Sequence, residues 1–407
     1  MDRAAPTPAP TGHSVQVISN TWARDSHDLF DFEAHHLQTK TFTVQRNAQF
    51  VRNGTDVQML SSHAHPSWPA GDTPTGAEHL LKLVQKDGSF WVDKGVSSSS
   101  SKNLWLVVRD LPTASHTLSE GDVIKLGQSK FRVRQLVTST YEDIQPELRL
   151  DDTGAFCSAD PETIDQLRTT SCRICLLEGS TEEDPLIKPC LCKGSIEYVH
   201  LGCLRHWVKG RLNLSDAPGG SYFYRPLPCE LCKSPYQAYC KMGNDVSSLV
   251  EVPKTTPPYI VLENMVRDSH QHSTRGLHVL SLAENKLLKL GRGHESDVRI
   301  ADVSISRCHA TIRLHQGSFT LEDNNSKFGT LVAMKKPRPL MPENPFSIQI
   351  GRTVLGLALQ PNQDPAAMAA LGAAAPQAVP RSMSLGADVN PAAGAAKDEQ
   401  DPNAAAA

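Results

Sequence analysis

The 407-residue sequence contains no long hydrophobic run and almost no net charge. No stretch of about 18 apolar residues occurs, so the sequence predicts no membrane-spanning helix. Its first residues lack the apolar core of a secretory signal, which favours a soluble protein of the cytosol or nucleus. The formal net charge is −3, and this argues against a protein that binds nucleic acid through a broad basic surface.

Large apolar residues are also scarce at both ends of the chain. Residues 1–26 are rich in Pro, Thr and Ala, and residues 362–407 consist mainly of Ala, Pro, Gly and polar residues. Such segments bury too little apolar surface to offset the entropy of ordering the chain. We therefore expect both segments to be disordered.

Cysteine is concentrated in one part of the sequence. Seven of the ten cysteines and one histidine share a run of about sixty residues, with the spacing C-x2-C, x14, C-x-C, x7, H-x2-C, x25, C-x2-C. The eight residues are Cys172, Cys175, Cys190, Cys192, His200, Cys203, Cys229 and Cys232. Zinc prefers four tetrahedral Cys or His ligands, and a C-x2-C turn brings two thiolates to one metal. The pattern predicts two structural zinc ions. A disulfide framework is disfavoured by the missing signal and by the single residue between Cys190 and Cys192.

Short apolar runs separated by turn residues flank the cysteine cluster on both sides. They occur over residues 27–140 and again over residues 256–361, and this pattern is typical of antiparallel β-sandwiches. Residues 122–127, DVIKLG, are echoed by residues 346–351, FSIQIG, and a further apolar run follows each of them. The echo indicates either a duplication or a coincidence of β-patterning.

The segments around the cysteines resemble the RING-CH domain of membrane-associated ubiquitin ligases. These segments are Cys172-Arg-Ile-Cys175, Pro189-Cys-Leu-Cys-Lys-Gly-Ser195, His200-Leu-Gly-Cys-Leu-Arg-His-Trp207 and Cys229-Glu-Leu-Cys-Lys233. A PHD finger is the alternative, but it has a wider gap between the third and fourth ligands and a Trp at the position of Leu227. The resemblance implies a cross-brace within residues 165–240. Cys172, Cys175, His200 and Cys203 would hold one Zn²⁺, and Cys190, Cys192, Cys229 and Cys232 the other.

The same resemblance implies a docking surface for a ubiquitin-conjugating enzyme (E2). Ile174 in the first zinc loop and Trp207, on a helix predicted over residues 201–212, would form its apolar platform. Lys233 would stand where many active RING domains place an arginine that clamps the ubiquitin-loaded E2. No residue of this protein would be catalytic, because such ligases act by positioning the thioester near a substrate lysine.

Residues 256–361 carry a second set of motifs. Leu290-Gly-Arg-Gly293, Ser304-Ile-Ser-Arg-Cys-His-Ala310 and Asn325-Ser-Lys-Phe-Gly-Thr330 resemble the forkhead-associated (FHA) domain, a β-sandwich whose loops bind phosphothreonine. The resemblance assigns phosphate contacts to Arg292 and Ser306, added charge to Lys327 and a flanking position to Arg307. His309 is expected to brace the loops from inside. Phe328 stands where the family often has Asn, which alters the contact with the peptide backbone.

Together these features predict a multidomain protein. It combines an all-β sandwich of FHA type, a small zinc-stabilised α+β cross-brace module and a degenerate β-sandwich-like N-terminal region. We expect a soluble RING-type E3 ubiquitin ligase whose partners are an E2, ubiquitin and phosphothreonine-containing proteins. The alternatives are a non-enzymatic phosphopeptide-binding scaffold and a PHD-like chromatin reader. A covalent cysteine ligase is disfavoured, because Cys157 and Cys240 lack a reactive context and Cys308 is expected to be buried in a strand.

Overall fold

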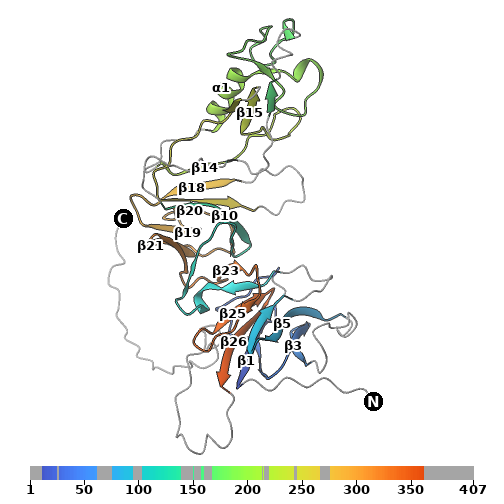
Figure 1. Cartoon of the computed structure of the whole chain (residues 1–407), viewed down its shortest axis with the longest axis vertical. Coiled ribbons are helices and arrows are strands. Elements are labelled where there is room, and N and C mark those ends of the chain that lie inside the picture. The colour runs from blue at the N-terminus through green and yellow to red at the C-terminus, as the bar shows by residue number, and fades with distance from the viewer. Residues whose placement is uncertain are drawn as a thin grey trace, which may run out of the picture.

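The computed structural model describes residues 12–24, 27–61, 76–94, 103–138, 150, 157–159, 167–212, 214, 220–242, 245–265 and 276–361. Three bodies follow one another along the long axis (Figure 1): a zinc module at one end, a sandwich in the middle and another sandwich at the far end. We call the far one the first sandwich, because it contains the N-terminal strands, and the middle one the second sandwich. Within the described residues no helix is long and apolar enough to cross a membrane.

The first sandwich is built from the two ends of the described chain. One layer holds β1 (His13–Trp22), β2 (Leu37–Val44), β25 (Phe346–Ile350) and β26 (Thr353–Pro361); the other holds β3 (Ala48–Asn53), β4 (Asp56–Ser61), β5 (Glu78–Lys86), β6 (Ser89–Asp93) and β24 (Arg338–Pro339). Phe50, Leu83, Phe346 and Leu357 are buried between the layers. Residues more than 250 positions apart therefore share one core.

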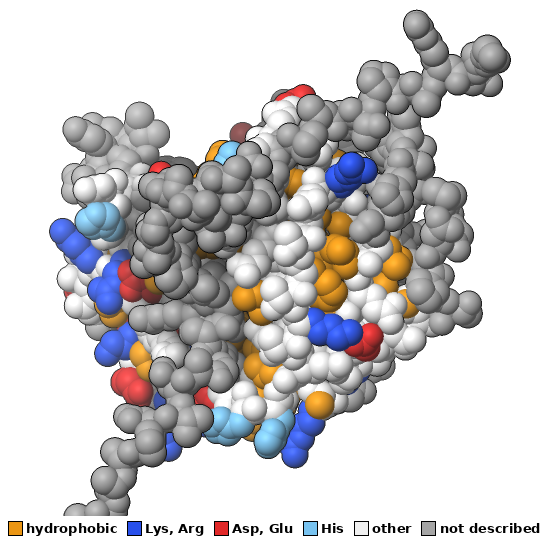
Figure 2. Space-filling view, turned by 90° about the horizontal axis from the view of Figure 1, so that it is seen from below, with side chains coloured by type: hydrophobic (Ala, Val, Ile, Leu, Met, Phe, Trp, Pro, Cys, Tyr) orange, Lys and Arg blue, Asp and Glu red, His pale blue; other side chains and the backbone are white. Residues whose placement is uncertain are grey.

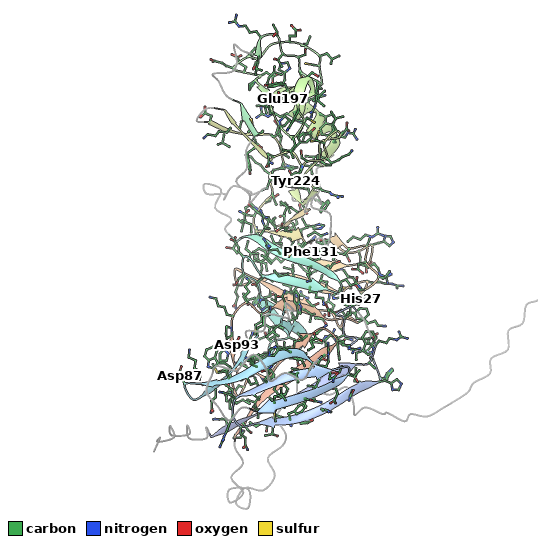
Figure 3. All side chains as sticks on the ribbon, turned by 90° about the vertical axis from the view of Figure 1, so that its right-hand side faces the viewer. His27, Asp87, Asp93, Phe131, Glu197 and Tyr224 are labelled. Atoms are coloured by element: carbon green, nitrogen blue, oxygen red, sulfur yellow. The ribbon has the colours of Figure 1, made fainter. Side chains whose placement is uncertain are left out.

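The second sandwich takes its strands from the middle of the chain. One layer holds β9 (Val123–Leu126), β10 (Ser129–Val137), β17 (Tyr259–Asn264) and β18 (Leu277–Ser281); the other holds β8 (Ser115–Thr117), β19 (Leu287–Gly291), β20 (Val298–Arg299), β21 (Ala310–His315) and β22 (Ser318–Asp323). Its core includes Phe131, Ile260, Ile312 and Phe319. Figure 3 labels Phe131 inside this middle body.

The two sandwiches share one continuous sheet with matching strand orders. From its centre, β7 (Trp105–Val107) is followed outward by β25, β26, β1 and β2, and β23 (Thr330–Ala333) by β9, β10, β17 and β18. The separate five-stranded sheets also correspond, as β4-β3-β5-β6-β24 and β20-β19-β21-β22-β8. The echoed hairpins β9–β10 and β25–β26 thus occupy equivalent positions in the two sandwiches. Each hairpin lies in the sandwich whose other strands come mainly from the opposite half of the chain. This correspondence favours duplication over coincidence.

Several expected boundaries are corrected by this arrangement. Residues 13–22 form β1, with Val15 and Val17 fully buried, so the expectation of disorder over residues 1–26 is wrong there. The segments 27–140 and 256–361 are not separate domains, because each contributes strands to both sandwiches. Pairing between distant strands decides this, and no local pattern reveals it. The predicted tail, residues 362–407, lies outside the described residues.

The zinc module is inserted between β10 and β17. It contains α1 (Leu201–Leu212), with the predicted bounds, the short strands β12 (Leu186–Ile187) and β13 (Val199–His200), and the 3-10 turn Gly194–Ile196. A small sheet of β11 (Cys157–Ala159), β15 (Tyr239–Met242) and β16 (Asp245–Ser248) packs beside them.

One strand joins the zinc module to the second sandwich. β14 (Tyr222–Tyr224) leaves the 25-residue segment between Cys203 and Cys229 and pairs with β18. Tyr224 is buried in a core that also contains Leu204 of α1 and Val279 of β18, and Figure 3 labels it at this junction. The long interligand segment therefore anchors the module through backbone pairing and shared apolar burial.

The opposite end of the molecule is the outer surface of the first sandwich (Figure 2). On its described part, hydrophobic side chains are scattered over the surface, while Lys and Arg stand in small groups with Asp and Glu nearby. The positive charges visible there do not merge into one stripe.

Candidate zinc sites and phosphate loops

The eight predicted zinc ligands come together as two tetrads. One consists of Cys172, Cys175, His200 and Cys203, the other of Cys190, Cys192, Cys229 and Cys232, and in each the ligand atoms lie within 4.8 Å of one another. The sulfurs of Cys192 and Cys229 are 3.8 Å apart. Two thiolates bound tetrahedrally at about 2.3 Å from zinc would be separated by about the same distance. The donor types and spacing fit Zn²⁺, and the interleaved order is that of a cross-brace.

His200 is oriented to bind metal through one ring nitrogen. Its Nε2 donates to the carbonyl oxygen of Gly179 at 2.8 Å, while Nδ1 lies 3.3 Å from Cys175 Sγ. A hydrogen bond to one ring nitrogen fixes the tautomer and leaves the other free for a metal. Cys172, another ligand of the same tetrad, accepts two hydrogen bonds: the backbone N–H groups of Ile174 and His200 both donate to its Sγ at 3.4 Å.

The zinc loops stabilise thiolates unequally. The N–H of Leu177 lowers the pKa of Cys175 to about 7 against the effect of burial. Burial raises the pKa of Cys229, but the N–H groups of Cys232 and Leu231 outweigh it and bring the pKa to about 6. Burial raises the pKa of Cys192 to about 12. One bound dication per tetrad would hold all of these groups as thiolates.

Arg173 connects the two tetrads and was not among the residues predicted from the sequence. It lies between two ligands of the first tetrad, yet its guanidinium donates to Cys190 Sγ at 3.6 Å and Cys229 Sγ at 3.7 Å in the second. It also donates to the hydroxyl of Tyr236 at 3.0 Å. Only its place between two ligands could have drawn attention to it.

Of the predicted E2-docking residues, Trp207 contacts the same tyrosine. Ile174 is 41% exposed. Trp207 is partly buried and packs edge-on against Tyr236, with ring centroids 5.7 Å apart. Lys233 is exposed, and its Nζ donates to the backbone oxygen of Glu230 at 2.7 Å.

Exposed apolar side chains gather on the zinc loops. Of the large hydrophobic residues exposed in the described chain, six belong to these loops: Ile174, Leu176, Leu177, Leu191, Ile196 and Leu231. Exposed apolar side chains concentrated in one small module mark an interaction surface.

Three loops at one end of the second sandwich carry the predicted phosphate-binding residues. We call them the phosphate loops: residues 292–297, 301–309 and 324–329. Arg292 N donates to Ser306 O at 3.0 Å, and Lys327 N donates to Ser306 Oγ at 3.2 Å. Gly293 N also donates to Arg307 O at 2.9 Å. The structure thus brings the four predicted residues onto adjoining loops, with the side chains of Arg292, Arg307 and Lys327 exposed.

His309 braces these loops from within, as the motif predicts. It is completely buried. Its Nδ1 accepts the Ser306 N–H at 3.1 Å, and its Nε2 donates to Gly329 O at 3.1 Å. Burial lowers the pKa of His309, which favours the neutral ring that this pair of bonds requires. A Cβ at Gly291 would lie 2.1 Å from Arg307 O, so only glycine allows the first two loops to approach this closely.

The remaining cysteines differ in one case from expectation. Cys157 and Cys240 are buried and pair in register across β11 and β15. Cys308 is exposed, contrary to the expectation of burial, because it lies in the second phosphate loop just before β21. Its Sγ accepts a hydrogen bond from Asn324 at 3.2 Å.

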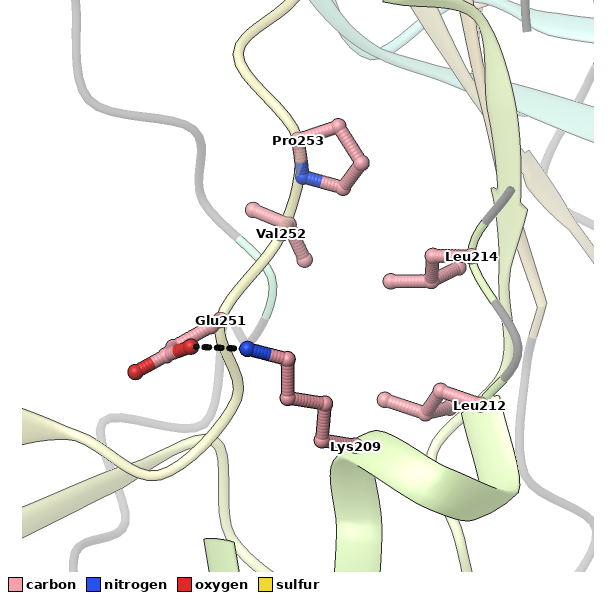
Figure 4. Close-up of a pocket in the computed structure, with 6 residues that line it drawn as sticks. All are labelled: Lys209, Leu212, Leu214, Glu251, Val252 and Pro253. Atoms are coloured by element: carbon pink, nitrogen blue, oxygen red, sulfur yellow. Dashed lines mark hydrogen bonds and ion pairs between the residues drawn. The ribbon is translucent and has the colours of Figure 1, made fainter. Parts of the chain in front are cut away.

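A shallow pocket of about 240 Å³ lies on the side of α1 that faces the segment leading to β17 (Figure 4). Leu212, Leu214, Val252 and Pro253 line it, and Lys209 forms a 3.4 Å ion pair with Glu251 at its rim. This pocket does not include the predicted zinc, E2-docking or phosphate-binding residues.

Fold and sites together define a zinc-binding protein of the β-sandwich class with an inserted cross-brace module. Residues 172–232 match the RING-variant domain and residues 288–355 match the FHA domain. The chain therefore contains both domains. The RING-variant match confirms the predicted RING-CH domain, in preference to a PHD finger, and with it the prediction of two zinc ions. The FHA match includes strands of both sandwiches, because its last strands lie in the first sandwich.

Three curated relatives match parts of this chain. The E3 ubiquitin-protein ligase MARCHF7 of Mus musculus is 26% identical over 227 residues, which cover 55% of this chain and 28% of that protein. The probable E3 ubiquitin-protein ligase MARCHF10 of Homo sapiens is 35% identical over 86 residues, 18% of this chain and 10% of that protein. The ERAD-associated E3 ubiquitin-protein ligase DOA10 of Saccharomyces cerevisiae is 40% identical over 67 residues, 16% of this chain and 5% of that protein. This chain spans less than a third of the length of each.

Proposed function

We propose that this protein is a RING-type E3 ubiquitin ligase that recruits phosphothreonine-containing partners through its FHA loops. The observation that carries the ligase proposal is the pair of interleaved Cys/His tetrads displaying exposed apolar side chains on their loops. Two of the relatives to which this chain is similar are named E3 ubiquitin-protein ligases. We place the protein in the cytosol or nucleus, as a prediction from its sequence.

The proposed ligase works by positioning. Each tetrad offers four protein ligands, so the zinc ions serve structure and leave no open position for hydrolysis. Ile174 and Trp207 would dock the E2, and the thioester between E2 and ubiquitin would be held near the substrate lysine. Tyr236 supports this surface, since it packs on Trp207 and accepts a hydrogen bond from Arg173.

Replacing Trp207 tests the ligase proposal. We expect Trp207→Ala to abolish autoubiquitination across a panel of E2 enzymes while two zinc ions per chain remain, because Trp207 is not a ligand. Phe223→Ala is the matched control: Phe223 is an exposed aromatic of β14 that packs on His278, and activity should persist. Unchanged activity of Trp207→Ala would remove this residue from the docking surface.

The phosphate proposal depends on charged and polar donors held on rigid loops. Arg292 and Ser306 would contact the phosphate, Lys327 would add charge and Arg307 would flank it. A phosphate dianion binds most strongly where such charge-assisted donors converge. His309 and Gly291 support this assignment, because they fix the loops that carry these side chains.

Replacing Arg292 tests the phosphate proposal. We expect Arg292→Ala to weaken binding of phosphothreonine peptides by about 1.5–3 kcal/mol, the usual value for a charge-assisted hydrogen bond. Arg313→Ala is the control, since Arg313 is paired with Glu322 on the face of β21, and its affinity should match wild type. Calorimetry showing equal affinity for the Arg292 variant and wild type would reject the site.

A non-enzymatic phosphopeptide scaffold is the second candidate. Lys233 favours it, because its ammonium is turned onto Glu230 O and lacks the planar fork of the arginine that clamps ubiquitin in many RING domains. The E2 panel separates the two proposals: a scaffold would bind phosphopeptides and show no ubiquitin transfer with any E2.

A further inference from the structure

The phosphate loops are seated against strands and turns from the N-terminal half of the chain. The turn between β9 and β10 holds the second loop: Gln128 N donates to Ser304 Oγ at 2.9 Å, and Ser129 Oγ donates to Asp302 Oδ2 at 3.2 Å. A Cβ at Gly127 would lie 2.2 Å from Ser304 Oγ. The loop carrying Ser306 thus depends on a hairpin more than 170 residues earlier.

The third phosphate loop is held by Arg109, in the 3-10 turn Val108–Asp110. Its guanidinium forms a 2.7 Å ion pair with Asp323, whose side chain is completely buried, and it also donates to Ser326 O. Asp323 Oδ1 accepts hydrogen bonds from Ser326 Oγ at 2.6 Å and Thr330 Oγ1 at 2.7 Å. Arg109 therefore neutralises the carboxylate on which the conformation of this loop depends.

The segment between β1 and β2 reaches the phosphate-site lysine itself. Phe32 N donates to Lys327 O at 2.9 Å, and Asp31 Oδ2 lies 3.4 Å from Lys327 Nζ. Asp31 Oδ1 accepts the Glu33 N–H at 2.9 Å, so this carboxylate has a fixed direction. The side chain of Asp31 is 11% exposed and that of Lys327 is 48% exposed. The buried Asp31 carboxylate is therefore fixed, and the exposed Lys327 ammonium is the group that can move.

We propose that both halves of the chain build the phosphothreonine site together, and that Asp31 limits its affinity by competing with the phosphate for Lys327. This inference rests on the proposed phosphopeptide function. A phosphate group carries about −1.5 to −2 charges at pH 7, so it attracts Lys327 more strongly than one carboxylate does. Phosphate binding must still draw the Lys327 ammonium away from Asp31 or share it with Asp31. It also brings the phosphate close to the Asp31 carboxylate. Arg292 and Ser306 then provide the remaining contacts to the phosphate.

The test uses the full chain and four proteins: wild type, Asp31→Asn, Lys327→Gln and the double variant. The probe is a fluorescein-labelled degenerate phosphothreonine nonapeptide pool, with the unphosphorylated pool as its control. We expect Asp31→Asn to tighten binding about 2- to 10-fold, the range of partly exposed charge pairs. Lys327→Gln should weaken binding, and the double variant should match Lys327→Gln. The asparagine oxygen keeps the bond from Glu33 N, and thermal unfolding checks that the fold is retained.

The outcomes separate the inference from the proposed function. Equal affinity of wild type and Asp31→Asn, in a protein that prefers the phosphorylated pool, would overturn the role of Asp31 and leave the phosphopeptide function standing. If Asp31→Asn still raises the affinity when Lys327 is replaced by Gln, Asp31 and the phosphate do not compete for Lys327. If neither wild type nor Asp31→Asn prefers the phosphorylated pool, both proposals fall.

Discussion

At the scale of single residues, Asp122 shows how a side chain ties the two halves together. Its carboxylate accepts the Ser119 N–H at 2.9 Å, pairs with Lys335 at 2.8 Å and lies 3.1 Å from His116 Nε2. Burial would raise its pKa, but the hydrogen bonds from His116, Lys335 and Ser119 outweigh burial and lower it to about 2. Lys335 follows β23, so this ion pair joins segments 213 residues apart.

The lowered pKa gives Asp122 a defined pH dependence. Because the folded state binds the proton more weakly than the unfolded state, the stabilisation is complete above about pH 4 and is lost as the pH falls toward 2. We expect Asp122→Asn to lose about 1–2 kcal/mol of stability at pH 7, less than the full shift implies because Lys335 is partly exposed. Urea unfolding at several pH values measures this difference.

Comparing the stability of the variants at each pH separates the contribution of Asp122 from the effect of acid on the zinc ligands. Asp87→Asn, at an exposed turn between β5 and β6, should unfold like wild type at every pH. The gap between Asp122→Asn and wild type should close between pH 4 and 2. A gap that stayed constant down to pH 2 would contradict the assigned ion pairs.

Groups of residues were predictable where a motif defines them. The eight ligands follow from their spacing, and the FHA resemblance placed Arg292, Ser306 and His309 on neighbouring loops. The structure brings each set together. Arg173 and Asp31 were not predictable. Their roles depend on partners in other elements, and a single arginine or aspartate has no distinctive local pattern.

At the scale of elements, β1 is a strand inside a segment that was expected to be disordered. It pairs with β26 over nine residues and with β2 over eight. Its flanking Pro, Thr and Ala residues suggested disorder, but Val15 and Val17 supply the buried face. A strand of mixed composition becomes stable when two neighbours satisfy its backbone groups.

Removing β1 should therefore be costly. Deletion of residues 1–24 exposes the edge of β26 and removes two fully buried valines, so we expect a loss of about 3–6 kcal/mol in the free energy of unfolding. Deletion of residues 1–11 alone leaves β1 in place and is the control. Denaturant unfolding of both proteins measures the loss. Equal stability of the two deletions would show that β1 does not support the first sandwich.

At the scale of the whole molecule, the zinc module and the sandwiches have different sources of stability. The core of the zinc module contains Cys172, Cys192 and Cys229, whereas the clusters inside the two sandwiches contain no predicted ligand among the described residues. Structural zinc contributes roughly 10–16 kcal/mol of apparent binding energy near neutral pH. The module should need metal to fold, and the sandwiches should not.

Chelation tests this division. We expect native mass spectrometry to find two zinc ions per chain, and removal of both to abolish hydrogen-exchange protection in α1 while the β5–β6 and β21–β22 hairpins stay protected. Cys190→Ser should lose metal, and Cys308→Ser, outside both tetrads, should retain two ions. Persistent protection of α1 in metal-free protein would show that the module folds without zinc.

Elements with a local cause could be predicted from the amino-acid sequence alone. The order of ligands along the chain, α1 and most of the strands depend on residues a few positions apart, where spacing and turn chemistry act directly. The tertiary structure decided which hairpin completes which sandwich, the anchoring of the zinc module through β14 and the pairing of Asp31 with Lys327. The two hairpins have similar local patterns, so the choice between them depends on packing and register between strands hundreds of residues apart.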